Sequence, residues 1–336
     1  MHTELLAPAA LGLLPVIVFL LMLLGLDSYK LVRLRLVVAV LAAGAATAFI
    51  GMQLNGFVAD LLDLSFSQLT RYLAPVVEES LKAAVIVVLL RTNRVGFLID
   101  AAICGFAVGT GFAAVENLWY LQLLPAANAG VWLLRGFGTA IMHGGASALF
   151  AIVTLALLER HGRIRAHTVL PGLLIAIALH SVYNHFFLSP FLSTVGILLV
   201  LPALLYYAFQ RSERAVGDWV GRGFDSDTDM LELIDSDRFD DSPVGRYLAS
   251  LKGKLDGPVV ADVFCYLRLH TELALRAKGQ LMLRESGFAA PPDPDTRAKL
   301  DELGYLRKSI GRTMLLAVHQ HLRMSHKELW QITMAR

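Results

Sequence analysis

Charge is scarce in this sequence. Only 17% of its 336 residues are Asp, Glu, Lys or Arg, and 56% are hydrophobic. A soluble domain carries about a quarter charged residues. The apolar residues gather before position 210, and the remainder has the charge content of a soluble protein. This distribution predicts a membrane-embedded region followed by a soluble one.

Cysteine is equally scarce. Cys104 falls in an apolar segment and Cys265 in the polar C-terminal part, so neither a disulfide nor a zinc-ribbon spacing is expected. The net charge of +2 and the scattered arginines exclude nucleic acid as a partner. The first twelve residues lack Lys and Arg, and the apolar run that follows is long. We therefore interpret it as a retained span rather than a cleaved signal peptide.

Familiar hydrolase motifs are also missing. The sequence has no H-E-x-x-H, no G-x-S-x-G and no paired G-x-G-D. Ser147 and Cys104 have no obvious adjacent base, so we interpret both as packing residues.

Seven apolar segments are long enough to cross a bilayer, which takes about 20 helical residues. Backbone groups in lipid must bond within their own segment, so helices are expected. The fold class is all-α: a polytopic bundle of about seven spans with a C-terminal soluble helical domain. Ser189-Pro190 would be either a loop or a kink. The predicted spans are Leu5–Leu26, Leu36–Ala59, Arg71–Leu90, Phe97–Leu124, Gly136–Leu158, Thr168–Leu188 and Phe191–Phe209.

Basic residues collect in alternate connections, and only Arg71 and Arg135 lie at the opposite ends. By the positive-inside rule, this predicts an external N-terminus and a cytoplasmic C-terminal part in a multi-pass plasma-membrane protein. The residues that set this orientation are Lys30, Arg33, Arg35, Arg91, Arg94, Arg160, Arg163, Arg165, Arg211 and Arg214.

The predicted spans contain ionisable side chains. Each costs about 2.5–3.5 kcal/mol at mid-membrane, so their retention indicates a function. His185 lies beside the outer interface and is interpreted as a packing residue; Asn117 is left unassigned. The full set is Glu78, Glu79, Lys82, Glu116, His143, His180 and His185, with Asn117 and Asn184.

These groups share a depth. A helical residue advances about 1.5 Å, and Glu78, Glu116, His143 and His180 each lie about five to eight residues from the outer end of their span. That places them about 8–12 Å below the outer surface. Packing residues have no reason to share a depth, so we predict one polar site.

The helix faces agree with this depth, because residues four apart share a face. Gly105, Gly109 and Glu116 lie on one stripe, and its glycines predict a close neighbouring helix. His180 and Asn184 also lie one turn apart. Glu116 and His180 should therefore face the bundle interior.

Carboxylates and imidazoles at one level support two kinds of hydrolysis. A glutamate can act as general base on water while His and Asn stabilise the oxyanion. Alternatively, Glu and His ligands can bind zinc and acidify its water. The candidate metal ligands are Glu78, Glu116, His143 and His180, and sequence spacing does not decide between the two mechanisms.

The motifs resemble those of the PrsW family of intramembrane proteases, over about residues 1–210. More distantly, they are similar to the CAAX prenyl endopeptidase and bacteriocin-processing group. The matching residues are E-E-x-x-K at Glu78, Glu79 and Lys82, F-x-x-x-E-N at Phe112, Glu116 and Asn117, His143, and H-x-x-x-N at His180 and Asn184.

The resemblance implies regulated intramembrane proteolysis for stress signalling. Its substrates would be single-span membrane proteins such as anti-sigma factors, cut near the outer face. By similarity to the CAAX group, Glu78 and Glu116 would hold the attacking water, and His180 with Asn184 would form the oxyanion hole.

The resemblance also implies supporting roles. Glu79 would pair with Lys82, and His143 would be a supporting donor or a metal ligand. Phe112 and Asn117 would support the second motif. The resemblance does not decide whether zinc is required.

Residues 211–336 are of a different kind. An acidic linker with a short helix is expected over 211–257, and a helical hairpin domain over 258–336. Its helices would be Val259–Ser286 and Asp295–Met324, separated by a Pro-Pro-Asp-Pro turn. His319 and His321 are expected on a solvated surface, and Ser325 with Glu328 predicts a capping box.

An alternative function uses the same polar residues as a relay, in a non-catalytic membrane scaffold or a proton-coupled small-solute carrier. Internal repeats, which are typical of many carriers, are not seen in the sequence. We therefore favour the protease interpretation.

Overall fold

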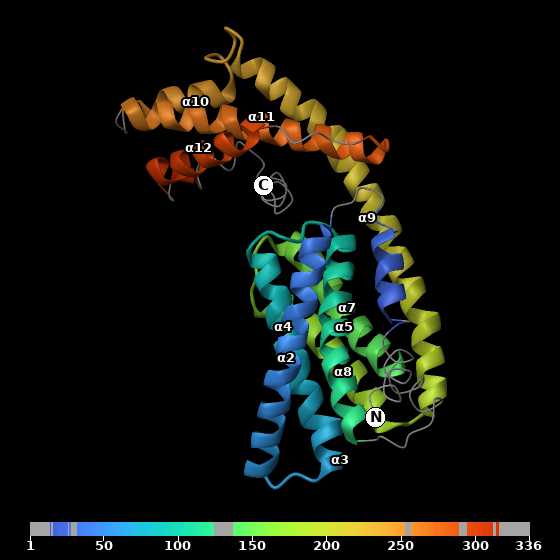
Figure 1. The fold of residues 1–336 in the computed structure, drawn as a ribbon. Helices are drawn as coiled ribbons and strands as arrows, with labels where there is room; N and C mark the ends of the chain where they lie inside the picture. The colour runs from blue at the N-terminus through green and yellow to red at the C-terminus, as the bar shows by residue number, and fades with distance from the viewer. Residues whose placement is uncertain are drawn as a thin grey trace. The chain divides into compact units, whose positions relative to one another are not determined.

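The computed structural model describes residues 14, 16–25, 27, 32–123, 137–252, 257–288, 294–311 and 314–315. All regular elements within these ranges are helical, without strands (Figure 1). The chain divides into two compact units, Met1–Glu213 and Arg214–Arg336.

The first unit is a bundle of long apolar helices. Five described helices are long and apolar enough to cross a membrane: Leu34–Leu61, Leu98–Tyr120, Gly138–His161, Ala166–His185 and Phe191–Ile234. They fall within the helices α2 (Leu34–Leu61), α5 (Leu98–Leu123), α7 (Gly138–His161), α8 (Ala166–His185) and α9 (Pro190–Ile234). The prediction of an all-helical, multi-pass membrane protein is confirmed in this form.

Two of the seven predicted spans are not among these five. Of the first, Val16–Gly25 is a short apolar helix, and most other residues of that span lie outside the described part. The third corresponds to α4 (Ala74–Arg91), which carries Glu78, Glu79 and Lys82. Helix α4 continues directly from α3 (Phe66–Gln68) and the π-helical turn η1 (Leu69–Leu73). The count of seven stays a prediction.

Glycines bring α5 and α7 into contact. A Cβ atom added at Gly105 would lie 2.6 Å from the backbone oxygen of Ser147, and one at Gly109 would collide with the backbone oxygen of His143. Only glycine allows this approach, as the stripe on α5 predicted. The backbone segment that carries His143 is therefore packed against α5 at Gly109, about two helical turns before Glu116.

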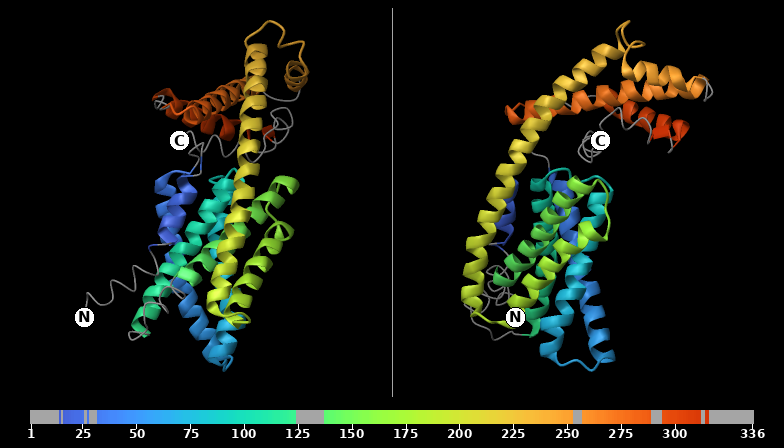
Figure 2. Two further views of the ribbon diagram at one scale, coloured as in Figure 1. Left: turned by 90° about the vertical axis from the view of Figure 1, so that its right-hand side faces the viewer. Right: turned by 180° about the vertical axis from the view of Figure 1, so that it is seen from behind.

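Helix α9 continues well beyond the predicted span. The sequence analysis ended the apolar segment at Phe209 and expected a linker from residue 211, whereas α9 runs as one helix to Ile234 (Figure 2). Hydropathy indicates where a segment passes from lipid to water, and a helix can continue across that boundary. Of the region predicted as a linker, residues 235–242 between α9 and the next helix form turns and bends.

The second unit contains α10 (Pro243–Leu251), α11 (Gly257–Glu285) and α12 (Pro294–Ile310). Lys299 bonds to Glu272, and Ser309 bonds to Asp262. As the residue number rises along α12, it falls along α11, so the two helices run antiparallel.

The second hairpin helix is shorter than predicted. It ends at Ile310, where Gly311 adopts a φ of 79° that halts a right-handed helix. Residues 314–315 are again helical. The predictions for His319, His321, Ser325 and Glu328 lie outside the described residues.

Candidate active site

The acidic and imidazole side chains of four helices converge. Glu78 comes from α4, Glu116 from α5, His143 from α7 and His180 from α8, and all four line one cavity of about 670 Å³. Asn184 also lines it. The structure thus brings these groups from four helices together around one cavity.

Glu79 lies behind the cavity and organises the site. Its Oε1 accepts a hydrogen bond from Lys82 Nζ at 2.6 Å and is 2.8 Å from Nδ1 of His180. The side chains of Glu79 and Lys82 are each only 1% exposed. Removing one partner of a buried ion pair leaves the other uncompensated, so Glu79 and Lys82 depend on each other.

Lys82 also determines the tautomer of His143. Its Nζ lies 2.9 Å from His143 Nδ1, and an ammonium group can only donate. Nδ1 therefore accepts, and the proton of the neutral ring lies on Nε2. Nε2 is 2.9 Å from Glu116 Oε2 and donates to it. Lys82 further lies 4.7 Å from the ring centre of Phe112, which gives that motif residue a cation–π role.

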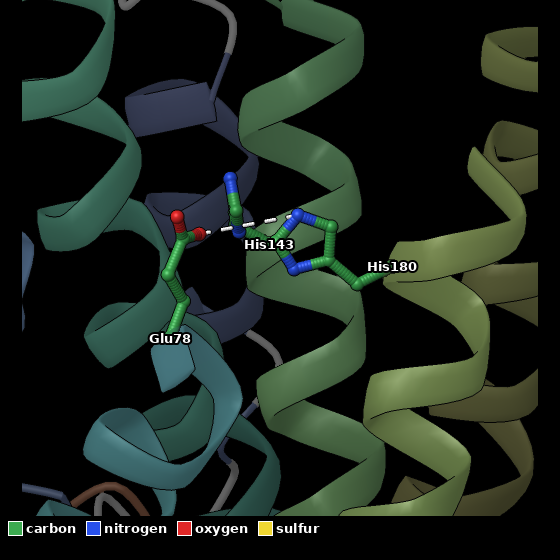
Figure 3. Close-up of side chains that lie close together, drawn as sticks. All are labelled: Glu78, His143 and His180. Carbon is green, nitrogen blue, oxygen red and sulfur yellow. Dashed lines mark ion pairs between the residues drawn. The ribbon is translucent and has the colours of Figure 1, made fainter. Parts of the chain in front are cut away.

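His180 has the opposite tautomer. Its Nδ1 must carry the proton to donate to Glu79, so Nε2 presents a lone pair. This Nε2 lies 3.9 Å from Glu78 Oε2 (Figure 3). Glu78 Oε2 is buried and has no hydrogen-bond partner among the described residues. Two lone-pair-bearing atoms thus face each other across a gap.

Pro75 explains the contacts of Asn184. Proline has no N–H, so the carbonyl that it would bond in an α-helix, that of Arg71, is released. In a π-helical register the released carbonyl is that of Thr70. Helix α8 satisfies both: Ser181 Oγ donates to the Arg71 oxygen at 2.6 Å, and Asn184 Nδ2 donates to the Thr70 oxygen at 2.9 Å.

The polar residues outside the cluster behave as structural elements. His185 Nδ1 bonds to its own helix at the Ser181 oxygen, 2.7 Å away, and its ring stacks on Phe187, as expected of a packing residue. Asn117 is buried. Cys104 and Cys265 are free cysteines, consistent with the expectation of no disulfide.

Sequence reasoning missed two polar residues. Asn55 of α2 lines the cavity and bonds to Glu78. Asp100 is buried at the start of α5, where its Oδ2 accepts the backbone N–H groups of Gly96 and Phe97 at 2.9 and 3.1 Å. An amide in a span free of charge could have signalled Asn55, and a carboxylate in a first helical turn could have signalled Asp100.

The residues fit a metal ion. Ligand atoms of Glu78, His143 and His180 all lie within 4.8 Å of one another. Two imidazoles with a carboxylate form a known catalytic zinc set. Glu78 Oε2 and His180 Nε2 are free to bind, whereas His143 would have to give up one of its present hydrogen bonds.

A buried Glu/His centre in a bundle of apolar helices is the arrangement that a membrane-embedded hydrolase requires. The model of the PrsW family, described as intramembrane metalloproteases, matches residues 32–208, more than half of the chain. The chain belongs to this family and is a peptidase. Comparisons with curated proteins and with solved structures found no match.

Proposed function

We propose that this peptidase cuts single-span membrane proteins, such as anti-sigma factors, near the outer face of the plasma membrane. In this proposal the chain has seven spans, an external N-terminus and a cytoplasmic second unit, and it serves stress signalling. The observation that carries it is the gap of 3.9 Å between Glu78 Oε2 and His180 Nε2 inside the cavity.

A water molecule suits this gap. Two acceptors about 4 Å apart can each take one hydrogen bond of normal length from the same water. Its lone pairs then point away from Glu78 and His180, toward a substrate carbonyl. Glu78 takes the proton as general base, and His180, held by Glu79, keeps the water in place.

Neighbouring groups complete the chemistry. Asn184 uses one N–H on Thr70, and its second N–H is offered to the oxyanion. His180 does not share that role, because its cavity-facing nitrogen accepts rather than donates. Glu116 bonds to His143 and supplies a second carboxylate to the lining of the cavity.

The same centre supports a resident metal. Glu78, His143 and His180 would hold a zinc ion, whose chemistry is to acidify a bound water and polarise the scissile carbonyl. Glu116, which also lines the cavity, would then be the carboxylate outside this ligand set.

Cleavage of defined peptides tests the proposal. The full-length protein is reconstituted in liposomes and incubated with a pool of synthetic peptides, each with about 20 apolar residues between polar flanks. Mass spectrometry should find cuts at the outer end of the apolar segment, absent with Glu78→Gln, Glu116→Gln and His180→Gln. Wild-type levels of cleavage in all three variants would refute the proposal. A pH-driven solute flux without peptide products would favour a carrier.

A further inference from the structure

Helix α2 brings an unassigned polar residue to the catalytic centre. Asn55 is 8% exposed, and its Nδ2 donates to Glu78 Oε1 at 3.0 Å. Gly51, one turn earlier, lies over the same side chain: a Cβ atom there would be 3.7 Å from Glu78 Cγ. The α2 backbone therefore runs close to Glu78 along a full helical turn.

We propose that Asn55 is a positioning residue for Glu78, which deepens the function proposed above and rests on it. The Asn55 bond occupies Oε1, so Oε2 is the oxygen left facing His180 Nε2. A glutamate has three rotatable side-chain bonds, and a free carboxylate would sample orientations in which neither oxygen faces the water. Holding the group in its reactive orientation removes that cost from the reaction.

The orientation of the Asn55 amide follows from chemistry. A flipped amide would place Oδ1 against a carboxylate oxygen, and two acceptors repel. With Nδ2 on Glu78, Oδ1 is buried without a hydrogen-bond partner in the part of the chain that the structure describes. A residue that served only to join helices would be expected to satisfy both ends of its amide.

Thr47 offers a matched comparison on the same helix. It is also buried, but its Oγ1 donates to the Gly44 oxygen of α2 itself, at 2.6 Å, and it does not line the cavity. Asn55→Leu and Thr47→Val each remove one buried polar group from α2. Only the first removes a contact to Glu78.

Steady-state kinetics test the proposal, with a peptide that wild type cuts and Glu78→Gln does not. We expect Asn55→Leu to lower kcat about 10- to 100-fold with KM within about 2-fold, which corresponds to one hydrogen bond to a charged group. Asn55→Gln, which keeps the amide, should recover part of the rate. Asn55→Asp, similar in shape but without the donor, should not. Thr47→Val should behave as wild type.

The outcomes separate this proposal from the parent one. If no peptide is cut by wild type, the proposed function fails. If wild type cuts and Glu78→Gln does not, but Asn55→Leu keeps its kcat, only the role of Asn55 is overturned. A rate loss matched by Thr47→Val, or one that appears in KM alone, overturns it too.

Discussion

Nδ1 of His180 lies 2.8 Å from Oε1 of Glu79, and this contact determines which ring nitrogen faces the cavity. Because Nδ1 of His180 donates its proton to Glu79, Nε2 of the neutral ring carries a lone pair. Glu79 therefore acts on the chemistry without lining the cavity, through the tautomer of His180 and the charge of Lys82.

Replacing Glu79 by Gln should damage both activity and stability. The charge that balances Lys82 is lost, and breaking a buried pair costs about 3–5 kcal/mol. We expect cleavage to fall at least about 100-fold, with a lower Tm in detergent. The double variant Glu79→Gln/Lys82→Met should recover Tm without recovering cleavage. Wild-type cleavage in the single variant would contradict this account.

Zinc analysis tests the metal site. If the centre holds zinc, as a His₂Glu set can, the purified protein should contain about one zinc per chain and lose both zinc and cleavage after chelation. His180→Gln should bind none. His185→Gln is the control, because this histidine bonds to its own helix, and it should keep the metal. An active, zinc-free wild type would leave Glu78 as base without a metal.

Ser181 and Pro75 should be energetically coupled. Ser181→Ala leaves the Arg71 carbonyl without its side-chain donor and should cost about 1–3 kcal/mol. In a Pro75→Ala background the restored N–H can bond that carbonyl, so the same change should cost less by about 1 kcal/mol. Thermal unfolding of the four proteins measures the difference. Strict additivity would show that Ser181 does not compensate for the proline.

The second unit should lose stability in acid through Glu272. Burial alone would raise the pKa of this carboxyl, but the Lys299 hydrogen bond and the charges of Lys299 and Arg276 outweigh it and lower the pKa. A lowered folded-state pKa contributes stability that is present above the unfolded value, about 4.3, and is lost as pH falls through the folded value.

Hydrogen exchange of α11 and α12 in the full-length protein, corrected for intrinsic rates, follows this loss. Protection should decline below about pH 4.3 in wild type and decline less in Glu272→Gln. Glu302→Gln, at an exposed position of α12, should match wild type. Identical profiles for all three proteins would exclude Glu272 as the source.

Much of the bundle follows from the sequence because the bilayer imposes both length and depth. The predicted span Leu36–Ala59 became α2 (Leu34–Leu61), and Gly136–Leu158 became α7 (Gly138–His161). Counting residues from helix ends predicted that Glu78, Glu116 and His180 lie close together, and all three line one cavity. Hydropathy and helical rise depend only on the residues of one segment, so both can be calculated from a single sequence.

The contacts between helices could not be predicted in the same way. The role of Asn55 depends on the rotation of α2 about its axis, which an apolar span hardly restricts. The tautomers of His143 and His180 depend on which partner reaches each nitrogen. The assignment of His180 to the oxyanion came from resemblance, and its hydrogen bond to Glu79 argues for a different role.

The bonds from Ser181 and Asn184 to the carbonyls released by Pro75 have a mechanical consequence. They join the segment that leads into α4 to helix α8. Glu78 lies on α4 and His180 on α8, so the two residues are held on helices that are bonded to each other. Helices α4 and α8 should therefore move together if the bundle opens to a substrate. The distance between Glu78 Oε2 and His180 Nε2 should then change little when a substrate enters.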